Sequence, residues 1–173
     1  MTYNPDNSLI DQYRIMHDAG YFQGSSLLKH VKEIAELVSK TGSTTLLDYG
    51  CGSGIQYSLH SSHLYWGGIL PTLYDPASRE HSSRPSGKFD GVICTDVAEH
   101  IPEEEIDDFL DDIFGYADKF IFITICTRPA KKLLPDGRNT HLTVRPEEWW
   151  IDKIKAVSEK YVGILVRLGW NYT

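Results

Sequence analysis

Short apolar runs alternate along the chain with longer stretches in which apolar residues recur every three or four positions. A short, nearly continuous apolar run is typical of a strand that is buried on both faces, and the three- and four-residue recurrence is typical of a helix that buries one face. The runs that predict strands cover residues 44–49, 69–74, 89–95, 120–126 and 161–168. The stretches that predict helices cover residues 27–38, 55–66, 103–116 and 145–159, the second with a blurred pattern.

Strands that alternate with helices predict an α/β fold. We expect a three-layer αβα sandwich around a mostly parallel sheet of about five to six strands. Such sheets bind ligands at the carboxyl ends of their strands. A chain of 173 residues, 41% of them hydrophobic, is long enough for one domain, which we expect to cover residues 1–173. Residues 1–24 are polar and aromatic with weak helical spacing, and we interpret them as a lid or cap segment.

The net charge of -7 opposes a broad nucleic-acid interface, because an acidic surface repels phosphate. The three cysteines lie far apart without a C-x-x-C pair, which favours free thiols in a reducing compartment. The first residues have no apolar core of the signal-peptide type, and the chain has no apolar run of membrane-spanning length. We therefore expect a cytoplasmic protein without a membrane partner.

The stretch Asp48-Tyr49-Gly50-Cys51-Gly52-Ser53-Gly54 follows the first predicted strand and carries the clearest candidate chemistry. Glycines remove Cβ atoms, so a ligand can lie against the main chain, and the turn is expected to aim backbone N–H groups outward. The dinucleotide pattern G-x-G-x-x-G fails because position 55 is isoleucine, and no Gly-Lys-Ser/Thr follows for a phosphate-binding Walker turn. A glycine-rich turn without a ligand is the alternative.

This stretch resembles motif I of the Rossmann-like, class I S-adenosylmethionine-dependent methyltransferases, written as an acid followed by G-x-G-x-G. The resemblance implies that the cofactor S-adenosyl-L-methionine is bound there. A second acid, Asp75, follows the next predicted strand, where the resemblance implies that it holds the ribose; the alternative is a turn aspartate in Asp75-Pro76. The cofactor residues expected from these two stretches are Asp48, Tyr49, Gly50, Cys51, Gly52, Asp75 and Pro76.

The segment FDGVICTDVAEHIPEEEI, residues 89–106, resembles ubiquinone-biosynthesis methyltransferases of the type 11–12 kind, in which F-D-x-V-x-x-x-x-V-x-E-H-[IV] recurs. The resemblance implies that Thr95, Asp96 and Val97 line the cofactor. It makes His100 a catalytic candidate, as a base that takes a proton from the acceptor. A histidine that only caps or shapes this loop is the alternative.

A fourth segment, RNTHLTVRPEEWW at residues 138–150, resembles the family's loop that closes over the acceptor. It supplies His141 as a second catalytic candidate and Arg145 and Trp149 as substrate candidates, joined by Tyr21 from the lid segment. Core packing of the tryptophans, and packing of the lid aromatics on the flank of the sheet, are the alternatives. The basic loop with Arg128, Lys131, Lys132 and Arg138 either attracts an anionic acceptor or is merely solvated.

The chain also departs from the family. Only residues 76–88 separate Asp75 from the next strand, so the third strand of the usual fold is expected to be missing and the adenine contact cannot be assigned by resemblance. The C-terminus is short, so the closing hairpin is expected to be truncated. The edges left exposed would be covered by the N-terminal segment or by another subunit in a homo-oligomer.

The sequence thus predicts methyl transfer from S-adenosylmethionine to a small-molecule acceptor, without nucleic acid as a partner. The alternative is a non-catalytic cofactor-binding or regulatory module of the same fold. No metal is expected: His60 and His63 have the spacing of two ligands, but the sequence suggests no convincing third one.

Overall fold

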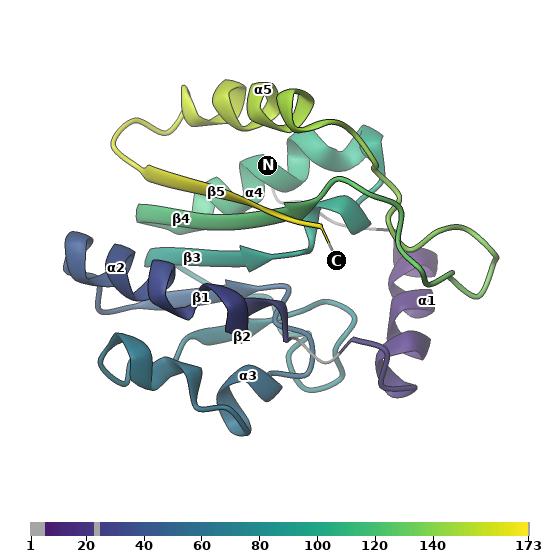
Figure 1. Cartoon of the computed structure of the whole chain (residues 1–173), viewed down its shortest axis with the longest axis horizontal. Coiled ribbons are helices and arrows are strands. Elements are labelled where there is room, and N and C mark those ends of the chain that lie inside the picture. The colour runs from purple at the N-terminus through teal and green to yellow at the C-terminus, as the bar shows by residue number, and fades with distance from the viewer. Residues whose placement is uncertain (1–5, 23–24, 173) are drawn as a thin grey trace.

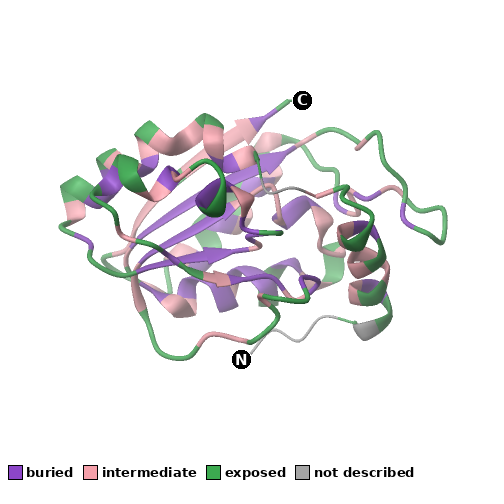
Figure 2. Cartoon of the chain, turned by 90° about the horizontal axis from the view of Figure 1, so that it is seen from below, coloured by how far each residue is buried: buried purple, intermediate pink, exposed green. Residues whose placement is uncertain are grey.

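The computed structural model describes residues 6–22 and 25–172. One sheet with the strand order β2-β1-β3-β4-β5 forms the centre of the molecule, and every pairing in it is parallel (Figure 1). The strands are β1 (Leu46–Tyr49), β2 (Thr72–Tyr74), β3 (Phe89–Thr95), β4 (Ala117–Cys126) and β5 (Leu165–Asn171). The three central strands β1, β3 and β4 are largely buried (Figure 2), as their apolar sequences predict.

Helices cover both faces of the sheet. On one face α4 (Ile106–Tyr116) and α5 (Glu147–Ser158) pack on alternate strand residues in a core that includes Phe109, Ile121 and Trp150. The other face carries the 3-10 helix η1 (Ser26–His30), α2 (Val31–Thr41), the short α3 (Ile55–Ser58) and the 3-10 helix η2 (Ser62–Trp66). Two short 3-10 helices, η3 (Ala98–His100) and η4 (Glu103–Glu105), connect β3 to α4.

The predicted α/β class is confirmed: the protein is a shortened, Rossmann-like three-layer sandwich with five parallel strands. All residues between β2 and β3 are described, and no strand forms among them. The expected loss of the third strand is therefore also confirmed. The helix expected over residues 55–66 is instead split into α3 and η2, because Ser61 adopts a left-handed conformation with φ of 50°.

The bounds predicted for the last strand are wrong. The apolar run at residues 161–168 suggested a strand there, but β5 begins only at Leu165 and continues to Asn171. Gly163 has a φ of 95°, which interrupts an extended backbone, and Val162 is 93% exposed. Tyr161 faces α4 instead, where its hydroxyl donates to the Asp111 carbonyl.

Helix α1 (Asn7–Asp18) lies across the carboxyl ends of the strands, at the right of Figure 1. Its apolar side, with Leu9 and Met16, packs on Leu134 of the long loop that follows β4. The predicted lid segment therefore contains a helix at the carboxyl-terminal edge of the sheet, while its residues 1–5 and 23–24 lie outside the described part of the chain. Among the described helices, none has the length and apolar character needed to span a bilayer.

Candidate functional site

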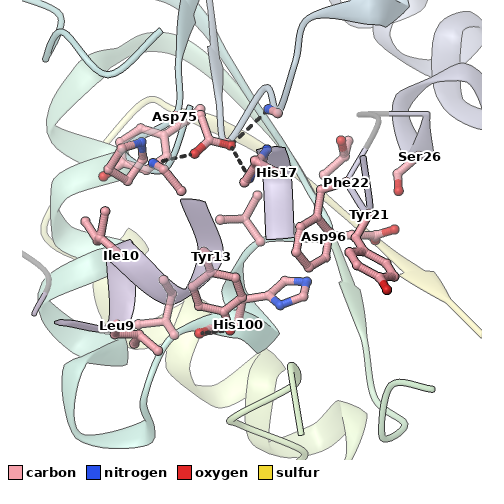
Figure 3. A pocket seen from close by; sticks show the side chains of 18 of the residues that line it. Leu9, Ile10, Tyr13, His17, Tyr21, Phe22, Ser26, Asp75, Asp96 and His100 are labelled. Atoms are coloured by element: carbon pink, nitrogen blue, oxygen red, sulfur yellow. Dashed lines mark hydrogen bonds and ion pairs between the residues drawn. The ribbon is translucent and has the colours of Figure 1, made fainter. Parts of the chain in front are cut away.

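A cavity of about 270 Å³ lies between α1 and the carboxyl ends of β1, β2 and β3 (Figure 3). Its walls come from segments far apart in sequence: the glycine turn after β1, residues 75–77 after β2, residues 95–97 after β3, and α1 with the residues that follow it. The predicted site residues on its walls are Tyr21, Tyr49, Gly50, Gly52, Asp75, Pro76, Thr95, Asp96, Val97 and His100. The sheet thus brings together most of the residues expected to bind a cofactor.

The backbone N–H groups of the glycine turn are used within the protein. Those of Gly50 and Cys51 donate to the Tyr74 carbonyl at 2.7 and 3.2 Å. The N–H of Gly52 donates to Oδ2 of Asp75 at 3.0 Å. The expectation that these N–H groups point outward to a ligand is therefore wrong, because the end of β2 satisfies them.

Gly50 is required by a neighbouring side chain. Its φ is 85°, and a Cβ atom placed there would lie 2.2 Å from Cγ2 of Val97. A similar but milder restriction holds at Gly54, where a Cβ would lie 3.0 Å from Cδ1 of Leu73. At Gly50 the missing side chain accommodates Val97, which itself lines the cavity.

Asp48 does not line the cavity and is 1% exposed. Its Oδ2 accepts hydrogen bonds from Nε2 of Gln56 at 2.9 Å and from the Tyr57 hydroxyl at 2.8 Å. Burial raises its pKa to about 6. The acid of the motif therefore fixes the start of α3 beneath the glycine turn. Cys51 is likewise buried outside the cavity wall, and burial raises the pKa of its thiol.

Asp75 is buried, but its carboxylate can still accept further hydrogen bonds. It is 8% exposed, and its Oδ1 and Oδ2 accept from the N–H groups of Ala77 (2.9 Å) and Gly52 (3.0 Å). Nε2 of His17, from α1, lies 3.7 Å from Oδ2 (Figure 3). Because each carboxylate oxygen can accept two hydrogen bonds, both retain capacity toward the cavity.

Asp96 is held in a left-handed conformation with φ of 55°, which is uncommon outside glycine and best tolerated by aspartate and asparagine. Its Oδ1 accepts from the Thr124 hydroxyl at 3.0 Å and from Nδ2 of Asn171 at 2.5 Å. Thr124 belongs to β4 and Asn171 to β5, so three strand ends converge on this carboxylate. Backbone strain of this kind is often found where side chains must be placed for function.

His100 lines the cavity, but its environment disfavours the charged form. Its Nδ1 lies 2.7 Å from the Thr140 carbonyl; since a carbonyl only accepts, Nδ1 carries the proton and Nε2 the lone pair. Burial, helped by nearby His141, lowers its pKa to about 3. Such a histidine is a weak base at neutral pH, which favours the interpretation that it shapes the pocket.

The cavity does not include the other three predicted residues, His141, Arg145 and Trp149. The ring of His141 meets that of His100 edge-on, with centroids 4.9 Å apart, behind the cavity wall. Arg145 forms a two-point ion pair with Glu103 of η4, both distances 2.8 Å, on the exposed surface. Trp149 packs at right angles on the core residue Trp150.

Several cavity residues were not predicted, among them Gln56 and Phe109. A polar residue in the first turn after the glycines was an available signal for Gln56, which is 1% exposed. Phe109 looked like any other core position of α4. Lys132, which the sequence left open between a solvated loop and a substrate contact, also lines the cavity.

Comparison of the chain with models of known protein families and with curated proteins finds no match. The resemblance to methyltransferases therefore consists of the short motifs quoted above.

Proposed function

We propose that this protein binds S-adenosylmethionine in the cavity under α1 and transfers its methyl group to a small-molecule acceptor. The observation that carries the proposal is the meeting of a glycine turn and a buried aspartate, Asp75, at the carboxyl ends of adjacent parallel strands. This is the position at which α/β sheets bind nucleoside ligands, and the cavity is close in size to the smaller ligand pockets of proteins.

The polar groups of the cavity suit the sugar of a nucleoside. Two ribose hydroxyls need acceptors, and both oxygens of Asp75 retain capacity after accepting from the backbone. The backbone bonds hold the carboxylate in place before a ligand arrives, which reduces the entropy lost on binding. His17 contacts the same carboxylate and would lie beside the sugar.

The amino-acid part of the cofactor needs charged partners other than the turn amides. Asp96 provides a negative side chain in the cavity wall for the ammonium group. Lys132 provides a positive one for the carboxylate. Its Nζ donates to the Tyr21 carbonyl, and an ammonium group has three donors, so two remain. In this proposal Lys132 holds the carboxylate in place of the N–H groups of Gly50 and Gly52, which are satisfied within the protein.

The bound sulfonium cofactor would supply an activated methyl group, so the residues mainly have to position the acceptor and exclude water. Helix α1 and Tyr21 cover the cavity and serve both purposes. With a pKa of about 3, His100 is poorly suited to remove a proton. This favours an acceptor that is nucleophilic without a base, such as a thiolate or a neutral amine.

A non-catalytic module that binds the cofactor is the second candidate, and one observation favours it. The N–H groups of the turn are satisfied by β2, and Gly50 is required by Val97, so part of the motif serves packing alone. A protein that has lost methyl-transfer activity would keep the glycine turn because it stabilises the fold.

Binding is tested by calorimetry with S-adenosylmethionine and with its demethylated product. We expect Asp75→Ala to weaken binding by at least ~1.5 kcal/mol, about tenfold, because two hydrogen bonds to a charged group are lost. Asp118→Ala is the matched control, because this half-exposed aspartate lies at the opposite, amino-terminal end of β4. Thermal unfolding without ligand shows whether each variant still folds. Absence of binding to the wild-type protein would refute the proposal.

Catalysis is tested separately with cofactor labelled in the methyl group. The protein is incubated with mixed metabolites, and transfer of label to a small molecule is measured. Transfer of the labelled methyl group that is reduced in Asp75→Ala supports an enzymatic function. Binding without transfer to any acceptor supports the non-catalytic module.

A further inference from the structure

We infer that Glu99, Cys126 and His141 form a binding site for a transition-metal cation, for which Zn²⁺ is the best fit. The three residues come from separate segments: Glu99 from η3, Cys126 from the last position of β4, and His141 from the loop that follows. One carboxylate oxygen, the thiol sulfur and one ring nitrogen all lie within 4.8 Å of one another. Cys126 and Glu99 are buried and His141 is partly exposed.

The carboxylate of Glu99 indicates that the cluster can bind a cation. Glu99 is fully buried, and its Oε1 accepts from the N–H of Cys126 at 3.0 Å. Its Oε2 is also buried and has no hydrogen-bond partner in the part of the chain that the structure describes. A buried carboxylate oxygen without a partner is costly, and a bound cation removes that cost.

One ring nitrogen of His141 keeps its lone pair. Its Nδ1 lies 2.6 Å from the Arg128 carbonyl, and because a carbonyl only accepts, Nδ1 carries the proton. Nε2 therefore keeps the lone pair. Metal-binding histidines usually have their second nitrogen held in this way. Burial also lowers the pKa of His141, so the ring is neutral and able to coordinate at neutral pH.

Burial, together with the neighbouring Asp96, raises the pKa of Glu99, and burial raises that of the Cys126 thiol. Both shifts favour the protonated forms, so a divalent cation that binds the thiolate and the carboxylate displaces the protons that these groups hold. The exchange of protons for a cation needs no oxidant or reductant.

The donor set selects the class of metal. One sulfur, one imidazole nitrogen and one carboxylate oxygen suit Zn²⁺ or a neighbouring transition metal, whereas Mg²⁺ and Ca²⁺ prefer oxygen donors alone. Ligand atoms around Zn²⁺ lie about 3.5 Å apart, so these side chains would have to approach by roughly 1 Å. Three protein ligands leave a fourth position for water or substrate.

The site adjoins the cavity through His100, whose ring contacts that of His141 and which lines the cavity. The inference does not depend on methyl transfer, because it rests on the three side chains alone. No metal was expected from the sequence, because residues 99, 126 and 141 have no local ligand spacing. The pairing of β3 with β4 brings the segments of Glu99 and Cys126 together, and the loop after β4 returns to η3, where the N–H of Thr143 donates to the Glu99 carbonyl.

The test is a titration of the chelator-treated full chain with Co²⁺, which replaces Zn²⁺ and reports thiolate ligation by a charge-transfer band in the near-ultraviolet. We expect the band to saturate at one equivalent of Co²⁺ and to disappear when Zn²⁺ is added. Cys126→Ser should abolish the band. Cys94→Ala, which removes a buried free thiol of β3 outside the cluster, should keep it.

A second variant guards against loss of folding. Glu99→Gln retains an acceptor for the N–H of Cys126 but no charge, and we expect it to weaken Co²⁺ binding at least tenfold while circular dichroism remains native. Absence of a saturable band in the wild-type protein would overturn the inference. So would an unchanged band in Cys126→Ser, or unchanged affinity in a folded Glu99→Gln protein.

Discussion

At the scale of single residues, the two most informative positions are Gly50 and Asp48, because the structure gives both a purpose inside the protein. The sequence correctly identified them as unusual: three glycines at alternate positions after an acid rarely occur without a reason. It could not show which atoms approach the turn. Val97 comes from the segment after β3, and a one-dimensional pattern does not encode the direction of its side chain or of that of Gln56.

We predict that Gly50→Ala lowers the free energy of unfolding by about 2–4 kcal/mol, because the new Cβ meets Val97 and the left-handed conformation disfavours alanine. The measurement is unfolding in denaturant. Gly20→Ala is the control: Gly20 has a φ of 76° with no atom within 4 Å of the added Cβ, so it should lose only about 1 kcal/mol. Equal losses in the two variants would show that Val97 does not restrict position 50.

Asp48 gives a prediction about pH. Its pKa in the folded protein is about 6, above the ordinary value of 3.8, so the native state holds a proton that the unfolded chain has released. Stability from this group is therefore greatest below about pH 4 and falls as pH rises toward 6. Asp48→Asn keeps an acceptor for Gln56 and Tyr57 without the charge. The free energy of unfolding of Asp48→Asn should be similar to that of the wild type at pH 4 and higher by roughly 1–3 kcal/mol at pH 7.

Stability curves of both proteins across this range provide the measurement. The common contributions of all other titrating groups cancel in the difference between them. A difference that stays constant from pH 4 to pH 7 would contradict the raised pKa of Asp48.

At the scale of elements, α1 decides the shape of the cavity although it is the helix least evident in the sequence. Its pattern is weak because few of its contacts are apolar. Instead, Gln12 exchanges hydrogen bonds with Asp136, and Asp18 pairs with Arg79 through two nitrogens. The Tyr13 hydroxyl lies within hydrogen-bond distance of two carbonyls, at 2.8 Å from Thr140 and 3.1 Å from His100.

We predict that Tyr13→Phe loosens α1 without unfolding the sheet. The loss of this hydroxyl should cost about 1 kcal/mol and speed hydrogen exchange of the α1 amides roughly fivefold, with α2 unchanged. Tyr65→Phe serves as control, because the Tyr65 side chain is 61% exposed on the surface of η2. Equal exchange rates in wild type and Tyr13→Phe would mean that other contacts hold α1 in place.

The strands show where prediction from sequence succeeds and where it stops. β3 was predicted with correct bounds because it is apolar and buried on both sides. β5 was misplaced because it lies at the edge, pairs only with β4 and is mostly half-buried, so its residues are less uniformly apolar. The glycine at position 163, which interrupts the extended backbone, falls inside the apolar run that suggested the strand.

At the scale of the whole molecule, parallel pairing is what creates the site. It places the carboxyl ends of β1, β2 and β3 at one edge of the sheet, and α1 closes that edge. The alternation of strands and helices predicted this edge as the ligand side, and the cavity lies there. Three features depend on long-range contacts that no local sequence pattern contains. They are the cover provided by α1, the Gly52–Asp75 hydrogen bond and the Glu99–Cys126–His141 cluster.

We propose above all that a nucleoside thioether binds between the glycine turn and Asp75. The most direct measurement is a titration of the ¹⁵N-labelled protein with S-adenosylhomocysteine, followed by amide chemical shifts. We predict saturable shifts at Gly52, Ala77 and Val97, and none at Gly42 or Ala117 at the opposite edge of the sheet. Absence of saturable shifts, or shifts confined to residues away from the cavity such as Gly115 and Tyr161, would contradict the claim.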